Sequence, residues 1–462
     1  MAENSLVKGL GLYGATSVVA GTMIGTAIFL VPSDMLRDLG SPLMVLGVWI
    51  FAGLLSLFGA LGYAELGAAI PEAGGEYVYL HRAYGPLPGF LYGWTQFLVA
   101  KSTSIATIST GFLLYLAYFF PQLAGTIFKR MLTVAGRSLV VNITGVQVGA
   151  VAMIALLSVV NALGVRKSGA VQTVFTISKL LVLTVIIVLG LILGHGSWGN
   201  FRGMVGGGPP HAGYLAAFGL ATVSALWAYD GWNNLSMVAG EVERPQRNVP
   251  AALIFGSMLV GVVYLLVNIA YFYVLTPVQA MDTMTIAADA TRRFLGHAGG
   301  AFVAVGVLIS TFATLNGSIL SGSRIPYAQA RDGLFPQALA GVHPRFHTPA
   351  ASIAAQAMVA GLFALTGQYQ GLYTKAIFSE WVFYALVTTA VFVLRRREPD
   401  LPRPYRTWGY PLVPAAFVTI ASLFLVNTFF QQRSDLLWCL ALMASGIPAY
   451  YLWGLWRRRK TS

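Results

Sequence analysis

About twelve apolar stretches, each roughly 20 residues or longer, follow one another along this chain, and they constrain its fold more than any other feature. A helix of that length crosses the hydrocarbon core of a bilayer, and it satisfies every backbone N–H and C=O group along the way. The stretches cover residues 12–39, 43–70, 87–119, 141–163, 168–194, 211–240, 250–275, 297–323, 349–367, 372–394, 411–430 and 435–455. They predict an all-α membrane protein with about 12 transmembrane helices.

Composition and charge support the same class of protein. Hydrophobic residues make up 56% of the 462 residues and charged residues only 10%, whereas soluble domains are about one quarter charged. If both termini are cytoplasmic, most of the 29 Lys and Arg residues fall on the cytoplasmic side, which is the positive-inside pattern. We therefore expect a multi-pass protein of the plasma (inner) membrane with both termini in the cytoplasm and no cleaved signal peptide.

Two of the stretches carry residues that weaken a helix at mid-membrane depth. The first contains GTMIGTAIFL at residues 21–30, and the sixth contains SALWAYDGWNNLSMVAGE at residues 224–241. In the sixth, Asp230 stands near mid-span, where a carboxylate costs at least about 2.5–3.5 kcal/mol unless it faces protein or water. Glycines such as Gly21 and Gly25 often serve close helix packing, and that alternative remains open. Interruptions at corresponding positions of two halves instead favour the binding site of a transporter.

The spacing of the interruptions predicts how the chain is organised. Stretches one and six correspond if five helices in residues 12–194 are repeated with inverted topology in residues 211–394, followed by two further helices in residues 411–455. A broken helix exposes N–H groups at the start of its second half and carbonyls at the end of its first half, with partial charges of opposite sign. Two facing breaks would therefore bind the carboxylate and the ammonium of an α-amino acid.

Backbone groups of the two breaks form most of the predicted site. N–H groups of Thr26, Ala27 and Ile28 would bind the carboxylate. Carbonyls near Met23, Ile24, Trp227 and Ala228 would bind the amine. The residues assigned to the substrate site are Ile24, Gly25, Thr26, Ala27, Ile28, Trp227, Ala228, Asp230, Gly231 and Asn233. We expect no catalytic residue, metal or cofactor, because all six histidines fall in loops or at the ends of spans.

Several segments, in the expected order, resemble the L-type amino acid transporters. GTMIGTAIFLVPS and GSPLMVLGVWIFAGLLSLFGALGYAELGAAIPEAGGEYVYL are similar to the first two helices of that family and the loop that follows. LWAYDGWNNLSMVAGEVERPQRNVPAAL is similar to its sixth helix, VQTVFTISKLLVL to its fifth, and SGSRIPYAQARDGLFP to the end of its eighth. The wider group is the amino acid–polyamine–organocation superfamily. The resemblance implies the leucine-transporter fold of five-plus-five inverted repeats and sodium-independent transport of L-amino acids, commonly by exchange.

The resemblance also assigns roles to single residues. Ala27 stands where the family tends to have a third glycine, which narrows the predicted carboxylate pocket. Lys179 matches a family lysine that lies where sodium-coupled relatives bind their ion, and it would donate to carbonyls near Gly21 and to hydroxyls such as Ser310 or Thr311. Snorkelling of Lys179 to the interface is the alternative. Trp227 matches an aromatic gate on the outer side of the substrate, or else it is a packing residue.

Asp230 carries two competing interpretations. Some relatives that accept dibasic amino acids have aspartate at this position, so Asp230 would attract the cationic tail of lysine, ornithine or arginine. Alternatively, it pairs with Lys101, the other lysine within a span. Asn233 would cap or coordinate the unwound segment. Glu65 and Glu380 are expected to be buried partners of backbone or tyrosine groups, although either could titrate and couple protons.

The remaining expectations concern partners and rival classes of protein. The loop EVERPQRNVPAAL is predicted to form an inner gate with Arg82 or Arg331. Residues 120–140 contain no cysteine, and the one cysteine of the chain, Cys439, lies in the last stretch. We therefore expect no disulfide-linked heavy subunit. The sequence leaves the oligomeric state open. The polarity of the breaks disfavours a membrane enzyme and an ion channel. The alternatives to an exchanger are a proton-coupled amino acid or polyamine permease and a transporter-like nutrient sensor.

Overall fold

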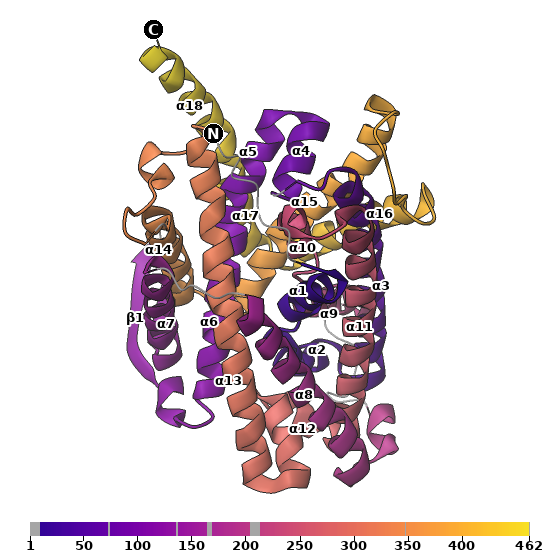
Figure 1. Cartoon of the computed structure of the whole chain (residues 1–462). Helices are drawn as coiled ribbons and strands as arrows, with labels where there is room; N and C mark the ends of the chain where they lie inside the picture. Colours follow the sequence, from indigo (N-terminus) through magenta and orange to yellow (C-terminus); the bar gives the residue numbers. More distant parts are fainter. Residues whose placement is uncertain are drawn as a thin grey trace.

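The chain folds into a bundle of helices, seen in a computed structural model that describes residues 10–461 apart from residues 73, 135–136, 164–168, 204–212 and 347. Figure 1 shows the long helices running in a common direction around the shorter α1, α2, α9 and α10. The prediction of an all-α, multi-pass architecture is confirmed.

The first half of the chain contains the first broken helix. Its elements are α1 (Leu12–Met23), the 3₁₀ turn η1 (Ala27–Phe29), α2 (Val31–Leu39), α3 (Pro42–Ala69), α4 (Glu76–Tyr84), α5 (Pro86–Thr95), the π turn η2 (Gln96–Ala100), α6 (Lys101–Leu116), η3 (Pro121–Ala124), β1 (Thr126–Val134), β2 (Arg137–Thr144), α7 (Gly145–Ala162), α8 (Gly169–Leu193) and η4 (Trp198–Arg202). Residues 12–39, predicted as one stretch, thus form two helices with an irregular segment between them.

The second half contains the second broken helix. Its elements are α9 (Tyr214–Tyr229), α10 (Asn234–Met237), η5 (Ala239–Glu241), α11 (Pro245–Val274), α12 (Pro277–Asp282), α13 (Ile286–Arg331), η6 (Gln337–Ala340), α14 (Ala350–Thr366), α15 (Tyr369–Arg397), α16 (Leu412–Gln431), α17 (Arg433–Ala444) and α18 (Gly446–Thr461). The last predicted stretch is therefore divided at Ser445.

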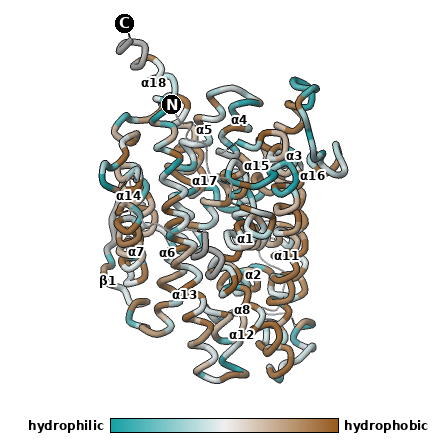
Figure 2. The backbone as a smooth tube through the Cα atoms, in the orientation of Figure 1, coloured by the Kyte–Doolittle hydropathy of each residue, from teal (hydrophilic) through white to brown (hydrophobic). Residues whose placement is uncertain are grey.

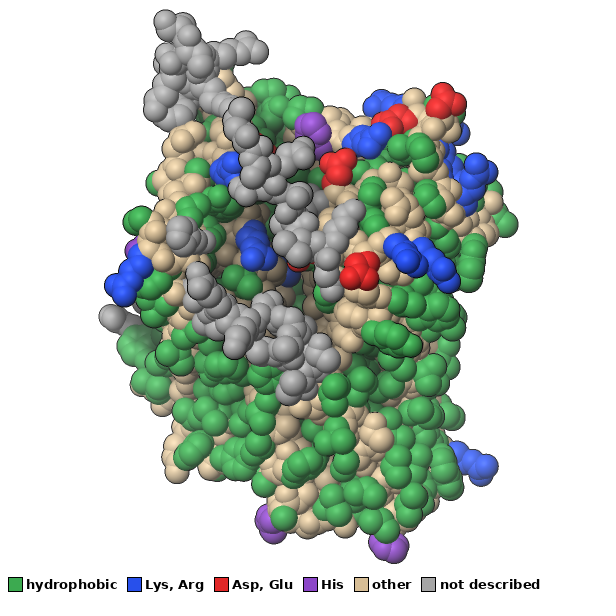
Figure 3. All heavy atoms as spheres, viewed as in Figure 1, with side chains coloured by type: hydrophobic (Ala, Val, Ile, Leu, Met, Phe, Trp, Pro, Cys, Tyr) green, Lys and Arg blue, Asp and Glu red, His purple; other side chains and the backbone are tan. Residues whose placement is uncertain are grey.

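Length and hydropathy identify the membrane-spanning part of the described chain. Nine described helices are long and apolar enough to cross a bilayer, and α9 and α14 are shorter apolar helices. Hydrophobic residues predominate along the middle of the bundle (Figure 2), and Figure 3 shows charged side chains gathered toward the end from which α18 projects. This distribution fits a protein surrounded by lipid at its middle and by water at its ends.

Three elements differ from the sequence expectations. The segment expected to be a loop at residues 120–140 contains an antiparallel hairpin, β1 paired with β2. As a result α7 begins at Gly145 instead of near residue 141, with a capping box formed by Thr144 and Gln147. A further helical segment precedes the eighth stretch: α13 starts at Ile286, but its helical path is interrupted at Gly296, whose φ of +64° only glycine adopts readily, so the helix of the eighth stretch begins after Gly296 as predicted.

The packing of long helices encloses the two broken ones. Helix α1 packs against α11 and α8, while α2 and α3 pack against α9. Helix α15 contacts α6, α9 and α16, and α13 contacts α6, α8 and α14. The breaks in α1 and α9 therefore lie at the middle of the bundle, where only protein groups or internal water can satisfy their backbone.

Candidate functional site

The first break follows Met23, the last residue of α1. Ile24 leaves the helical conformation (φ −74°, ψ 84°), and η1 begins at Ala27. Among the described residues, no backbone hydrogen bond is formed by the N–H groups of Thr26, Ala27 and Ile28, because they stand at the start of the turn. These are the N–H groups that the sequence assigned to a carboxylate.

The second break follows Tyr229, the last residue of α9. Asp230 is extended (φ −64°, ψ 148°), and Gly231 has a φ of +107°, which side chains rarely tolerate. A Cβ atom on Gly231 would also lie 3.1 Å from the backbone C and O atoms of Thr22. Glycine is therefore required at position 231 both by its own conformation and by the close approach of the first break.

Direct hydrogen bonds join the two breaks. Thr22 Oγ1 lies 2.8 Å from Gly231 O and 2.7 Å from Val18 O in its own helix, so its proton is shared between these two carbonyls. The Tyr264 hydroxyl, on α11, lies 2.8 Å from Met23 O and 3.0 Å from Ala228 O, so it shares its proton between carbonyls of both breaks. The sequence assigned those two carbonyls to the substrate amine, and Tyr264 went unrecognised because a buried tyrosine 36 residues beyond Ala228 carries no local signal of this contact.

Lys179 reaches the first break from α8. Its Nζ atom donates to Gly21 O over 2.9 Å and to Thr314 Oγ1 over 2.8 Å, and the residue is 2% exposed. The hydroxyl acceptor is therefore Thr314 rather than Ser310 or Thr311. Thr311 instead donates to the carbonyl of Val307 one turn earlier in its own helix. Lys179 does not snorkel, because a buried ammonium with two acceptors is already satisfied.

Aromatic side chains cover the breaks on one side. The indole of Trp227 is nearly parallel to the ring of Tyr373 (11° between the planes, centroids 6.3 Å apart), and its Nε1–H donates to the Tyr369 hydroxyl over 3.3 Å. The Tyr369 hydroxyl also lies 3.3 Å from Thr26 Oγ1. Trp227 is thus held by two tyrosines of α15 beside the first break.

The second break is anchored by two groups that the sequence did not predict. The Tyr384 hydroxyl donates to Asp230 Oδ1 over 2.7 Å, and the Asn233 amide donates to Glu76 Oε1. Glu76 is completely buried in α4, between the second and third spans, and it also accepts from Tyr92. Burial raises the pKa of Glu76 to about 7 despite these hydrogen bonds. Glu76 and Asn233 are 157 residues apart in the sequence, so no local pattern indicated their contact.

Ion pairs at the end of the bundle that holds α4 differ from the expected set. Arg82 pairs with Glu398 (2.7 Å) instead of with the acidic loop at residues 241–243. Hydrogen bonds from Arg82 lower the pKa of the Glu398 carboxyl. Glu65 accepts the backbone N–H of Thr407, in line with the expected backbone partner, and it also binds Arg395 at 2.7 Å and Arg403 at 3.5 Å, which the sequence did not predict.

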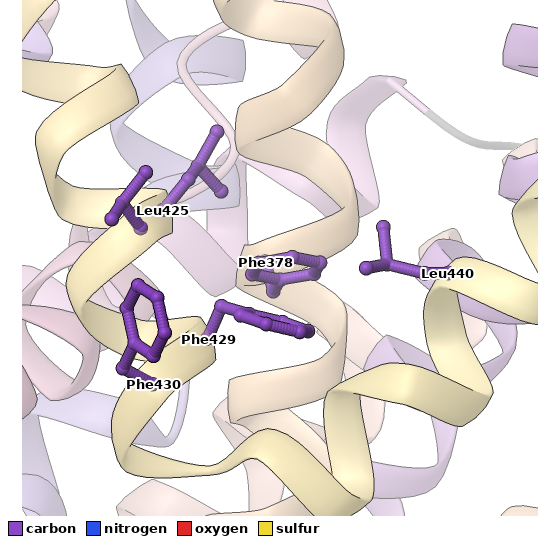
Figure 4. A pocket seen from close by; sticks show the side chains of 6 residues that line it. Phe378, Leu425, Phe429, Phe430 and Leu440 are labelled. Atoms are coloured by element: carbon purple, nitrogen blue, oxygen red, sulfur yellow. The ribbon is translucent and has the colours of Figure 1, made fainter.

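Other predicted residues lie at or near the breaks. Ile24, Ala27, Ile28, Ala228 and Asn233 are buried, whereas Gly25 and Asp230 are partly exposed. An apolar pocket lies elsewhere, between α15, α16 and α17, and includes neither break (Figure 4). Phe378, Leu425, Phe429 and Leu440 line that pocket.

Proteins similar in sequence to this chain are amino acid transporters. The model of the family described as amino acid permease matches residues 10–447. The chain is 33% identical to the b(0,+)-type amino acid transporter 1 of Homo sapiens, over 97% of this chain and 88% of that protein. It is 32% identical to the serine/threonine exchanger SteT of Bacillus subtilis (strain 168), over 100% of this chain and 99% of that protein. It is also 30% identical to the human cystine/glutamate transporter, over 98% of this chain and 87% of that protein.

Proposed function

The chain belongs to the amino acid permease family, and from this premise we propose that it is a sodium-independent L-amino acid exchanger that binds its substrate between the two broken helices. It is a transporter and not an enzyme. Two similar proteins, the b(0,+)-type transporter and the serine/threonine exchanger, move amino acids. The direct contact of the two breaks through Thr22 and Gly231 is the observation that carries the proposal.

The groups at the breaks match the two charges that every α-amino acid carries. The N–H groups of Thr26, Ala27 and Ile28 open onto the start of η1, where a carboxylate is favoured by unpaired donors. The carbonyls of Met23 and Ala228 converge on the Tyr264 hydroxyl. An ammonium bound there would replace or join Tyr264 as the donor, so this tyrosine holds the carbonyls in place between substrates.

The position of Lys179 supports independence from sodium. Its ammonium already donates to a carbonyl at the end of α1 and to a hydroxyl of α13. Sodium requires the same kinds of oxygen ligand, and a fixed positive charge among them repels a second cation. We therefore assign to Lys179 the task of joining α1, α8 and α13, which an ion performs in sodium-coupled transporters of the same superfamily.

Contacts at both ends of the bundle fit alternating access. At the end that holds α4, Arg82 pairs with Glu398, and the Tyr77 hydroxyl donates to Asp332 over 3.1 Å. At the other end Arg37 pairs with Asp34 and donates to the carbonyls of Met281 and Thr283. We assign the first set to the cytoplasmic gate and the second to the outer gate, with both termini in the cytoplasm of a cell whose plasma membrane holds the protein.

The proposed transporter works without a disulfide-linked subunit. Cys439, the one cysteine of the chain, is buried in α17 and 2% exposed, so packed side chains cover its thiol. Substrates are neutral amino acids, with cationic ones accepted through Asp230. The assignment of the N-terminal five and next five helices to inverted repeats belongs to the same proposal, because it makes the two breaks equivalent.

Exchange in proteoliposomes tests the proposal directly. Vesicles loaded with an unlabelled amino acid should take up the same labelled amino acid, and uptake should be equal in sodium and in choline buffers. Empty vesicles should take up far less. A requirement for sodium, or no uptake of any of the twenty amino acids, would overturn the proposal. Uptake into empty vesicles driven by an inward proton gradient would instead establish the proton-coupled alternative.

A further inference from the structure

Two tyrosines on one face of α15 lie beside α2, the helix that follows the first break. Tyr369 and Tyr373 are four residues apart, both are buried, and their rings meet edge to face with centroids 5.4 Å apart. Helix α2 packs against α12, which Figure 1 shows at the end of the bundle opposite α4. The hydroxyl groups of the two tyrosines need partners inside the bundle, because a buried hydroxyl is costly without a hydrogen bond.

The hydroxyl of Tyr373 joins α15 to two further helices. It lies 2.8 Å from Ser224 Oγ on α9, and it donates to Asp34 Oδ2 on α2 over 3.4 Å. An ionised carboxylate only accepts hydrogen bonds, so the Ser224 hydroxyl donates to Tyr373 while Tyr373 donates to Asp34. Ser224 precedes Trp227 by one turn of α9, and the Trp227 indole stacks on the Tyr373 ring. One tyrosine thus holds α9 at two places and α2 at a third.

Tyr369 continues these contacts to the first break. Its hydroxyl oxygen accepts the Trp227 N–H over 3.3 Å and lies 3.3 Å from Thr26 Oγ1. Gly111 on α6 packs against the same place, since a Cβ atom there would lie 3.1 Å from both Thr26 Cγ2 and Tyr369 Cε2. The Tyr369 ring therefore has little room to move while Thr26 stays in place. At this point α15, α9 and the first break are packed as one unit.

Asp34 connects this unit to the end of the bundle that holds α12. It is partly exposed, and it pairs with Arg37 one turn later in α2. Arg37 in turn donates to the carbonyls of Met281 and Thr283, at the end of α12. The hydrogen bond between Tyr373 and Asp34 therefore links the buried tyrosines of α15 to the last contacts at this end.

A tyrosine–aspartate contact of the same chemistry lies at the opposite end. The hydroxyl of Tyr77, on α4, donates to Asp332 Oδ2 just beyond α13, over 3.1 Å. That contact is exposed, whereas Tyr373 is completely buried. Water competes with an exposed hydrogen bond, so the contact of Tyr373 has the larger effect on the free energy of the closed state.

We propose that Tyr369 and Tyr373 are positioning residues that hold the site closed on the side of Asp34. The contact between Tyr77 and Asp332 has the corresponding role on the other side, and the balance of the two sets the side to which the empty transporter opens. This inference rests on the proposed function, because only a transporter closes each side in turn. Opening toward α12 separates α2 and α9 from α15, and the loss of a contact made in one state shifts the population toward the other.

Exchange of leucine measured from both sides of the membrane tests the proposal. In proteoliposomes with one protein orientation, the half-saturation concentration on each side falls as more of the empty protein opens to that side. Tyr373→Phe keeps the ring on Trp227 but removes the hydroxyl. The ratio of the external to the internal half-saturation concentration should therefore fall about five-fold, the effect of one hydrogen bond. Tyr77→Phe should raise the same ratio, by a smaller factor. A merely structural role would leave the ratio unchanged.

A matched control and a double variant locate the cause of the change. Tyr271 on α11 is buried, and its hydroxyl has no hydrogen-bond partner in the part of the chain that the structure describes. Tyr271→Phe should therefore leave the ratio unchanged. Asp34→Ala removes the acceptor of Tyr373 and should lower the ratio. The double variant Asp34→Ala/Tyr373→Phe should lower it by less than the product of the two single factors, because both changes remove one shared contact. Fully multiplicative effects would overturn that contact as the cause.

The accessibility of a thiol on α2 gives a second measurement for variants too inactive for exchange. Ser33 is buried, and its hydroxyl has no hydrogen-bond partner among the described residues, so Ser33→Cys in a Cys439→Ala background is a mild change. A thiol reagent that does not cross membranes should label this thiol from outside about five-fold faster when Tyr373→Phe is added. An unchanged ratio together with an unchanged labelling rate would overturn the proposal, while continued leucine exchange would preserve the proposed function.

Discussion

The two breaks at the centre of the bundle differ in the origin of their charge. The first break, residues 24–26, contains no ionisable side chain, and the charge beside it comes from Lys179 on α8. The second break carries its own carboxylate, Asp230, and is tied through Asn233 to the buried Glu76. One break therefore presents mainly backbone groups, whereas the other presents backbone groups together with acidic side chains.

This difference separates what all substrates share from what distinguishes them. Every L-amino acid has the same carboxylate and ammonium, which backbone N–H and C=O groups can bind without reference to the side chain. Discrimination between substrates needs side-chain groups, and these are concentrated at the second break. Substitutions around the first break should therefore impair all substrates alike, whereas substitutions around the second should change selectivity.

The largest effect is expected from Lys179→Met. The substitution leaves Gly21 O and Thr314 Oγ1 without their charged donor in a buried site, at a cost of about 1.5–3 kcal/mol, or roughly 10- to 100-fold in exchange. Leucine and lysine uptake into loaded proteoliposomes should fall by the same factor. The exposed Lys129→Met serves as the control and should behave as wild type. A loss confined to one substrate class would contradict the general role of the first break.

Asp230→Asn should produce the next largest effect, and a selective one. The amide can still accept from the Tyr384 hydroxyl, but it no longer carries the charge that attracts a cationic side chain. Uptake of lysine and arginine should fall about ten-fold more than uptake of alanine and leucine. The measured quantity is the ratio of lysine to leucine exchange in one preparation. Equal losses for both classes would assign Asp230 to structure.

Sequence patterns predicted the broken helices better than the contacts around them. Gly25 and the Asp230–Gly231 pair located both breaks correctly, because a helix interior rarely tolerates such residues without a reason. Thr314 replaced the predicted Ser310 and Thr311 because sequence alone does not determine which turn of α13 faces Lys179. A difference of one turn moves a side chain by about 5 Å along the helix axis.

The sequence patterns did not predict contacts between segments that are distant in the sequence. Tyr264, Tyr384 and Glu76 each bond to a break from another element, and none stands in a local motif that would indicate its partner. The same limit explains why Arg82 was assigned to the wrong acidic residue. Tertiary packing chooses among several candidate partners of equal chemistry, and a single sequence does not contain that choice.

Tyr264→Phe tests whether the two breaks act as one unit. The substitution removes the hydroxyl shared by Met23 O and Ala228 O but keeps the buried ring. The loss of a neutral hydrogen bond costs about 1 kcal/mol, so exchange should fall roughly five-fold. Lysine and leucine exchange should decrease equally, because the carbonyls serve the common amine. A change in the ratio of lysine to leucine exchange would show instead that Tyr264 contributes to substrate selectivity, as the second break does.

The smallest expected effect is on the pH dependence of stability. It comes from Glu76, which contacts the second break through Asn233. Burial raises the pKa of Glu76 from 4.5 to about 7. Between these values the folded protein holds a proton that the unfolded chain releases, so stability falls as the pH rises toward 7 and then levels off. Glu76→Gln stays neutral and should lack this decline, while its amide oxygen can still accept from Asn233.

Thermal unfolding in detergent at a series of pH values between about 5 and 8 measures this difference. The unfolding temperature of the wild type, relative to that of Glu76→Gln, should decrease by about 2–4 °C as the pH rises through this range. Any loss caused by the substitution itself is the same at every pH, so the slope reports titration alone. Parallel curves for the two proteins would show that Glu76 does not titrate there. Asp230 would then be the only one of the two carboxyls at the second break that contributes charge to its function.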